Sequence, residues 1–221
     1  MQRFTLIHDG SDQGWQAAYL AFHIAARLGS PLLVLLVNSA ADKETLIQRS
    51  AQVKVGGRAA GLAIETRLVM EFSIDMVLAN VSSIDGLFVP QRLIPNEETA
   101  ERLLEALPCP MWVVAKDSET YEMAVLVDDF AADEKAISYV INLSHRIQQP
   151  LTGLIRENEF ELTSDVDASI TWIPLPNFSS VEVSTAMNQL GAGLLFLPLS
   201  RFSLVKELPF TCVICPLIQN A

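Results

Sequence analysis

The sequence predicts an α/β protein made of two tandem copies of one parallel, five-stranded unit, and three observations support this. Apolar stretches alternate with helical patterns along the chain, which is typical of parallel strands joined by right-handed crossovers. The apolar stretches are continuous, as in PLLVLLV at residues 31–37, which indicates a sheet covered on both faces. The same order of elements then recurs in the second half. We therefore expect two layered α/β domains.

The repeat is visible when Asp9 is aligned with Asp128. Further identical pairs follow in the same register: Ala17 and Ala136, Arg27 and Arg146, Pro31 and Pro150. A weaker match follows between GLFVPQ at residues 86–91 and LLFLPL at 194–199, and then between EALPCPMWVV at 105–114 and KELPFTCVIC at 206–215. The spacing shrinks towards the C-terminus, so the second copy is reduced. Chance similarity between two α/β units is the alternative interpretation.

The first copy, residues 1–116, opens with an apolar strand and a long helix. Ser11 or Asp12 is an N-cap residue for that helix, and Gly29 follows its end. Gly56 and Gly57 weaken the second helix. The expected strands are residues 3–9, 31–37, 64–70, 86–89 and 111–115, and the expected helices are 12–28, 42–60, 73–81 and 96–107, the last capped by Asn96.

The second copy, residues 121–221, repeats this plan after a linker at residues 117–120. The segment 157–168 is too short and acidic for a full second helix, and the last helix shrinks to one or two turns near residues 202–208. The expected strands are residues 122–128, 151–156, 169–173, 193–197 and 211–215, and the remaining helices are 133–148 and 181–190.

Composition limits the classes of function. The net charge of −11 repels phosphate backbones and anionic lipid, so nucleic acid is not an expected partner. No apolar run approaches the roughly 20 residues of a membrane-spanning helix, and Asp9 interrupts the N-terminus too early for a signal peptide. Three cysteines suit a reducing cytoplasm. Cys212 and Cys215 fall within an apolar strand, which favours buried thiols over a redox pair.

The order of these motifs resembles the universal stress protein family in a tandem form. The resemblance is carried by FTLIHDGSDQGWQAAYLAFHIAARLGSPLLVLLV at residues 4–37, DGLFVP at 85–90 and LPCPMWVV at 107–114. It implies two doubly wound, Rossmann-like sheets of the adenine nucleotide alpha hydrolase type, which bind ligands where the strand order reverses. It also implies a cytoplasmic stress-response protein.

The resemblance implies a nucleotide position at Asp9, Gly10 and Ser11, with Asp128 as its counterpart in the second copy. In nucleotide-binding members, the acid at the end of the first strand approaches the adenine. Asp9 therefore has two readings: a ligand contact, or an acid that satisfies backbone donors at a helix N-terminus. Asp128 has the same two readings.

The sequence departs from the family where the phosphates of ATP are usually held. Residues 89–104 read VPQRLIPNEETAERLL, which contains prolines and no glycine, and Glu97 and Glu98 open the following helix. Prolines remove N–H donors, and carboxylates repel phosphate. Arg92 offsets some of this charge. We therefore expect no usual phosphate loop and no required cofactor, with ATP as the alternative cofactor. His8, His23 and His145 stand apart without metal-ligand spacing, so no metal is expected.

The leading hypothesis is a non-catalytic regulatory protein that binds a protein partner or small ligand, because the glycine loops are missing and the second copy is reduced. A third class, an enzyme of a related α/β family, would need a catalytic cluster, and the sequence has no GxSxG elbow, P-loop or HExxH motif. The alternative is an ATP-binding protein that uses Asp9, Asn38, Pro90 and Arg92 of the first domain alone. The uncharged strands at residues 110–115 and 210–218 are expected to meet within one chain, as an intramolecular pseudo-dimer, because bare apolar edges aggregate.

Overall fold

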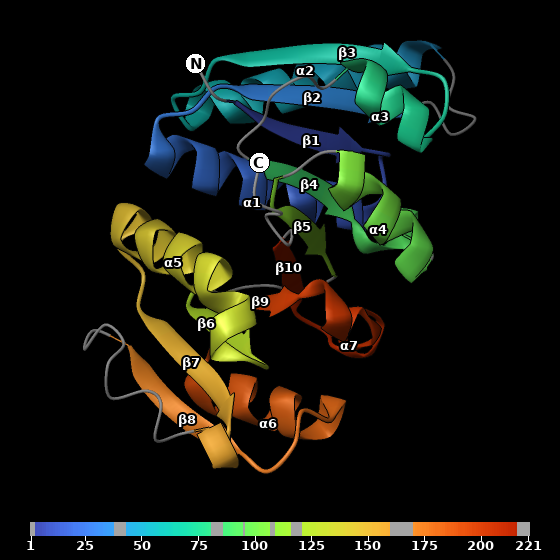
Figure 1. Cartoon of the computed structure of the whole chain (residues 1–221). Coiled ribbons are helices and arrows are strands. Elements are labelled where there is room, and N and C mark those ends of the chain that lie inside the picture. The colour runs from blue at the N-terminus through green and yellow to red at the C-terminus, as the bar shows by residue number, and fades with distance from the viewer. Residues whose placement is uncertain are drawn as a thin grey trace. The chain divides into compact units, whose positions relative to one another are not determined.

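The computed structural model describes residues 3–37, 43–80, 86–94, 96–106, 109–115, 121–159 and 170–215. The chain divides into two compact units, Met1–Lys116 and Asp117–Ala221. Figure 1 shows the strands and helices of both. The expected linker at residues 117–120 and the candidate residue Asn38 lie outside the described residues.

Unit 1 is a parallel sheet whose strands follow the order β3-β2-β1-β4-β5. The chain winds outward from β1 to β3 and returns to β4, so the strand order reverses between β1 and β4. The elements are β1 (Phe4–His8), α1 (Asp12–Leu28), β2 (Leu32–Val37), α2 (Lys43–Ala59), β3 (Ile64–Val69), α3 (Ile74–Asn80), β4 (Gly86–Pro90), η1 (Gln91–Leu93), α4 (Glu97–Ala106) and β5 (Met111–Val114).

The helix boundaries in unit 1 follow from local capping chemistry. The Ser11 side chain accepts a hydrogen bond from the backbone N–H of Gly14, and Gly29 adopts φ 63° at the end of α1. Asn96 accepts from the backbone N–H of Thr99 at 2.9 Å and so caps α4 as predicted. Helix α1 lies beside α2, and α3 lies beside α4. Strands β1, β2, β4 and β5 are buried along their length, which confirms the expected covered sheet.

Unit 2 has the corresponding strand order β10-β9-β6-β7-β8, again parallel. The order reverses between β6 and β9. Its elements are β6 (Met123–Val127), α5 (Phe130–Ile147), β7 (Leu151–Arg156), β8 (Thr171–Leu175), α6 (Ser180–Leu190), β9 (Leu194–Pro198), η3 (Leu199–Arg201), α7 (Phe202–Glu207) and β10 (Thr211–Cys215). Helix α7 has 6 residues and α4 has 10, and α7 covers the one or two turns expected near residues 202–208.

Two expected boundaries in unit 2 were wrong. Helix α5 begins at Phe130 rather than at Asp133, because Asp129 accepts from the backbone N–H of Ala132 and acts as the cap. Strand β8 covers Thr171–Leu175 rather than residues 169–173, and it includes Pro174. A proline is compatible with β8 because this strand lies at the end of the sheet order and pairs on one side, with β7.

Candidate functional site

Each unit has an ion pair at the carboxyl ends of its strands, where the strand order reverses. In unit 1, Asp9 follows β1 and pairs with Arg92 of η1, the turn after β4. In unit 2, Asp128 follows β6 and pairs with Arg201 of η3, the turn after β9. Doubly wound sheets bind their ligands at this position. Both candidate acids therefore lie where a ligand is expected, and both already contact a cation of the chain.

Asp9 is 3% exposed, and both of its carboxylate oxygens accept hydrogen bonds. Oδ1 accepts from the backbone N–H of Ser11 at 3.0 Å and from its hydroxyl at 2.6 Å. Oδ2 accepts from Nε of Arg92. Burial works to raise the pKa of Asp9, but the hydrogen bonds from Ser11 and Arg92 outweigh it and hold the pKa below its usual value. The carboxylate is therefore ionised and internally paired at neutral pH.

Gly10 is required by the shape of the turn between β1 and α1. It adopts φ +79°, which favours glycine, and a Cβ atom built on it would lie 2.1 Å from Cζ of Arg49. The Arg49 side chain thus covers the backbone at the point where a ligand would approach the turn. The predicted site residues Gly10 and Ser11 both serve contacts within the chain.

His8 is buried beside this turn in its neutral form. Its Nδ1 atom accepts from the backbone N–H of Gly10 at 3.0 Å. Its ring meets that of Trp15 edge to face, with 4.4 Å between centroids. Burial lowers the pKa of His8 to about 4. His8 is therefore a packing residue at neutral pH rather than a cation at the site.

The loop after β4 is tied to the start of α1. The backbone N–H of Arg92 donates to Oε1 of Gln13 at 3.1 Å. Pro90 is buried at the end of β4, two residues before Arg92. Glu97 and Glu98 are exposed in the first turn of α4. The structure thus brings Asp9, Gly10, Ser11 and Arg92 together, with Pro90 beside them.

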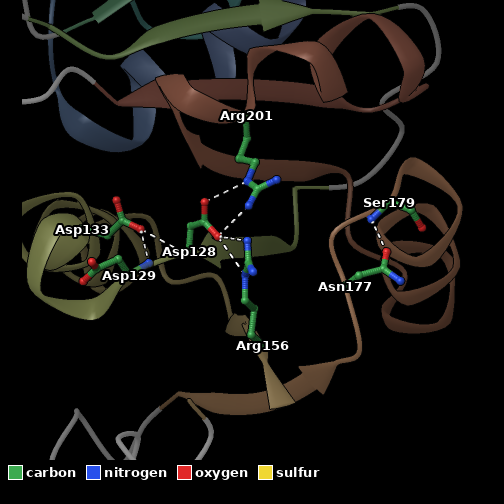
Figure 2. A network of polar contacts seen from close by, with 7 residues as sticks. All are labelled: Asp128, Asp129, Asp133, Arg156, Asn177, Ser179 and Arg201. Carbon is green, nitrogen blue, oxygen red and sulfur yellow. Dashed lines mark hydrogen bonds and ion pairs between the residues drawn. The ribbon is translucent and has the colours of Figure 1, made fainter. Parts of the chain in front are cut away.

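In unit 2, two arginines converge on Asp128 (Figure 2). Arg201 donates from Nε to Oδ2 at 2.9 Å and from Nη2 to Oδ1 at 2.7 Å. Arg156, at the end of β7, donates to Oδ1 from Nε at 3.0 Å and from Nη2 at 2.7 Å. Burial works to raise the pKa of Asp128, but the hydrogen bonds of the two arginines lower it below its usual value. One carboxylate is thus shared by two guanidinium groups.

Phe178 completes this cluster from the loop between β8 and α6. The Cζ atoms of Arg156 and Arg201 each lie 5.5 Å from the centroid of its ring. These are cation–π distances, and the buried ring fixes the positions of both heads. We call Asp128, Arg156, Phe178 and Arg201 the arginine cluster of unit 2.

The neighbouring acids Asp129 and Asp133 are engaged at the start of α5. Oδ2 of Asp133 accepts from the backbone N–H groups of Asp128 and Asp129, at 3.0 and 3.2 Å (Figure 2). Burial raises the pKa of Asp133, and the charges of Asp128 and Asp129 act in the same direction. Among the described residues, the ion pairs of Arg156 and Arg201 are both with Asp128.

Sequence reasoning missed three of the four residues in the arginine cluster. Arg201 could have been found by comparing the two halves of the sequence, since an arginine follows the fourth strand of each unit, at Pro90-Gln-Arg92 and at Pro198-Leu-Ser-Arg201. The one-residue offset hides it in a strict alignment. Arg156 has no such counterpart, because Val37 stands at the matching position at the end of the second strand of unit 1. No pattern in the sequence indicated Phe178.

The remaining candidate chemistry is absent from the described part of the chain. Cys212 and Cys215 are buried in β10, and burial raises the pKa of each thiol to about 12, as expected for unreactive thiols. Within the described ranges, His, Cys, Asp and Glu side chains form no group of three or more suited to a metal ion. No helix described by the structure has the length and apolarity needed to cross a membrane.

The fold is shared with solved structures at low sequence identity. A universal stress protein from Archaeoglobus fulgidus DSM 4304 superposes with a TM-score of 0.70 at 10% identity, covering 96% of this chain and 97% of that one. A protein of unknown function from Pseudomonas aeruginosa PAO1 gives 0.63 at 12%, covering 97% and 92%. The cytoplasmic domain of a prokaryotic cation chloride cotransporter gives 0.62 at 12%, covering 100% and 98%.

No family model matches the sequence. No curated protein matches it either. At 10–12% identity the structural likeness establishes the fold. The chain therefore has the Rossmann-like α/β fold of universal stress proteins, which confirms the predicted fold class.

Proposed function

We propose that this chain is a non-catalytic, cytoplasmic stress-response protein of the universal stress type, which binds a protein partner or a small ligand. We propose further that neither unit holds ATP in the manner usual for the family. One observation carries this proposal: in both units, the acid after the first strand is ion-paired to an arginine from the turn after the fourth strand. In each unit, the carboxylate that would contact an adenine is already paired with an arginine of the chain.

The loop after β4 supports the same proposal. A phosphate cradle needs free backbone N–H groups at a helix start. Pro90 has no N–H, and the N–H of Arg92 is used by Gln13. The backbone N–H of Thr99 in the first turn of α4 is used by Asn96. The exposed carboxylates of Glu97 and Glu98 add negative charge there.

Binding of a nucleotide at Asp9 would also have to displace Arg92. Removing one partner from a buried ion pair leaves an uncompensated charge and costs about 3–5 kcal/mol when both partners are buried. The Arg92 side chain is 49% exposed, so water compensates part of the loss and a cost of about 1–3 kcal/mol is the reasonable expectation. ATP would have to offset this cost before gaining any affinity.

Isothermal titration with ATP and Mg²⁺ tests the proposal, with a nucleotide-binding universal stress protein as positive control. The expected result is no binding with a Kd below about 10 µM. Asp9→Ala is the diagnostic variant, because the alternative function uses the first unit through Asp9, Asn38, Pro90 and Arg92. Binding tighter than about 10 µM that disappears in Asp9→Ala would overturn the proposal and establish the alternative.

We also propose that the uncharged strands at residues 110–115 and 210–218 meet within one chain as a pseudo-dimer. Strands β5 and β10 fall within these segments and carry no charged side chain. Unpaired apolar edges are aggregation sites, so each strand needs a partner. Size-exclusion chromatography with light scattering over a wide concentration range should give one constant mass. Concentration-dependent association would argue against pairing within the chain.

A further inference from the structure

We infer that the arginine cluster of unit 2 binds a small oxyanion, a phosphate or carboxylate group carried by a small molecule. The inference rests on the proposed ligand-binding function and assigns the chemistry of the ligand. The cluster lies at the carboxyl ends of β6, β7 and β9, on both sides of the strand-order reversal. Ligands of this kind of sheet bind there.

The charges of the cluster favour an anion. Arg156 and Arg201 share the carboxylate of Asp128, so one acid faces two guanidinium groups. The second positive charge has no carboxylate of its own among the described residues. An oxyanion that contacts both guanidinium groups would supply the missing negative charge. Arginine recognises carboxylate and phosphate through paired N–H groups.

The arginines retain donors for such a ligand. Their bonds to Asp128 use Nε and Nη2 of each side chain. Within the described residues, neither Nη1 group donates to an acceptor. The side chains of Arg156 and Arg201 are 42% and 26% exposed, so an anion can reach them from solvent.

The cluster is also preorganised. Asp128 holds both arginines by two hydrogen bonds each, and the Phe178 ring lies 5.5 Å from both guanidinium carbons. Fixing two long side chains before binding removes much of the entropy cost of ordering them. Helix α6 begins two residues after Phe178, and its N-terminal dipole adds positive potential.

Unit 1 has a different charge balance at the corresponding acid. Asp9 is ion-paired to Arg92 alone among the described residues, and the acid is buried. Val37 ends β2 where Arg156 ends β7. The oxyanion site is therefore assigned to unit 2 and not to unit 1.

Titration of the full chain with sodium phosphate and, in parallel, sodium succinate tests the inference, with sodium chloride at equal ionic strength as the reference. The readout is the ¹⁵N-resolved Nε–H signals of Arg156 and Arg201. We expect saturable shifts with one of the two anions, and the stronger response identifies phosphate or carboxylate as the ligand group. Arg156→Gln should weaken binding by at least about tenfold while the Arg201–Asp128 pair remains.

Arg146→Gln is the matched control, because it removes the same charge from an exposed position in the last turn of α5. It should bind the anion as the wild type does. Urea unfolding of Arg156→Gln separates a loss of folding from a loss of binding, and Arg156→Lys, which keeps the charge without the planar fork, should retain part of the affinity.

Three outcomes would overturn the inference: no saturable shift with either anion, equal affinity in Arg156→Gln, or an equal loss in Arg146→Gln. Failure of the proposed function is a different result. ATP binding that is abolished by Asp9→Ala and unaffected by Arg156→Gln would refute the proposed function without bearing on the anion site.

Discussion

Lowering the pH from about 7.5 to about 5 is expected to destabilise unit 1 through His8. This side chain is 1% exposed, and burial lowers its pKa to about 4, against an ordinary value of 6.5. The charge of Asp9 works to raise the pKa, and that of Arg49 works to lower it, but burial is the larger effect. The unfolded chain therefore takes up a proton at His8 in a pH range where the folded chain does not.

The magnitude follows from these two values. Between pH 6.5 and pH 4 the unfolded state binds more protons at His8, so stability is greatest above pH 6.5 and falls as the pH falls through this range. At 1.36 kcal/mol per pH unit, the loss reaches about 2 kcal/mol by about pH 5. The pKa values of Asp9 and Asp128 are lower in the folded chain than in the unfolded chain. The stability that these carboxylates contribute is therefore lost as the pH falls below the ordinary carboxyl pKa, which is a lower pH range than that of His8.

Urea unfolding at a series of pH values measures the loss of stability. Hydrogen exchange of the β1 amides, measured at the same pH values, assigns that loss to unit 1. The control is His8→Gln, whose amide oxygen retains an acceptor for the backbone N–H of Gly10. It should lose about 2 kcal/mol less than the wild type over the same pH interval. His23, whose pKa is also lowered by burial, contributes equally to both proteins and cancels in the comparison.

Equal pH dependence in the wild type and in His8→Gln would refute this reasoning. It would mean that the pKa of His8 is the same in the folded and unfolded chain, so that Nδ1 does not remain an acceptor for the backbone N–H of Gly10 at pH 5.

Three further predictions concern stability and reactivity. Arg92→Gln should lower the free energy of unfolding of unit 1, measured in urea, by about 1–3 kcal/mol, because buried Asp9 loses its cation. The control Arg102→Gln, at an exposed position, should leave the free energy of unfolding almost unchanged. Equal losses in the two variants would contradict the ion-pair argument. Gly153→Ala should destabilise unit 2 by about 1–3 kcal/mol, since the added Cβ would lie 2.1 Å from the Trp172 ring; a neutral result in urea unfolding would show that the ring moves freely. Cys212 and Cys215 should react with iodoacetamide at pH 8 on the order of 1,000-fold more slowly in the folded protein than in urea. The reason is that burial raises the pKa of each thiol from 9.0 to about 12, which lowers the thiolate fraction. Fast labelling of the native chain would contradict their burial.

The layout of the fold was predictable because its determinants are local. Ser11 and Gly29 define the ends of α1 through contacts within three to five residues. Continuous apolar stretches define the strands, as the buried residues of β2 show. The match between the segments that begin at Asp9 and Asp128 predicted the same order of elements for unit 2. The expected strand at residues 169–173 was offset by two residues from β8, Thr171–Leu175, which includes Pro174 at an edge of the sheet.

The candidate site was predictable only in part. The turn residues Asp9, Gly10 and Ser11 were identified, but their partners come from distant segments. Arg92 was expected to offset Glu97 and Glu98, yet it pairs with Asp9. An ion pair of this kind depends on which strands become neighbours and on which side chains reach across the sheet edge. No local pattern in the sequence encodes that choice.

The ion pair of each unit has a consequence for the order of folding. Asp9 and Arg92 are 83 positions apart, and Asp128 and Arg201 are 73 apart. Such a contact closes a very long loop, so it forms after the first and fourth strands have aligned. Interactions absent from the transition state retard unfolding without accelerating folding. Arg92 and Arg201 should therefore slow unfolding of their units. Replacing either arginine should raise the unfolding rate and leave the refolding rate unchanged.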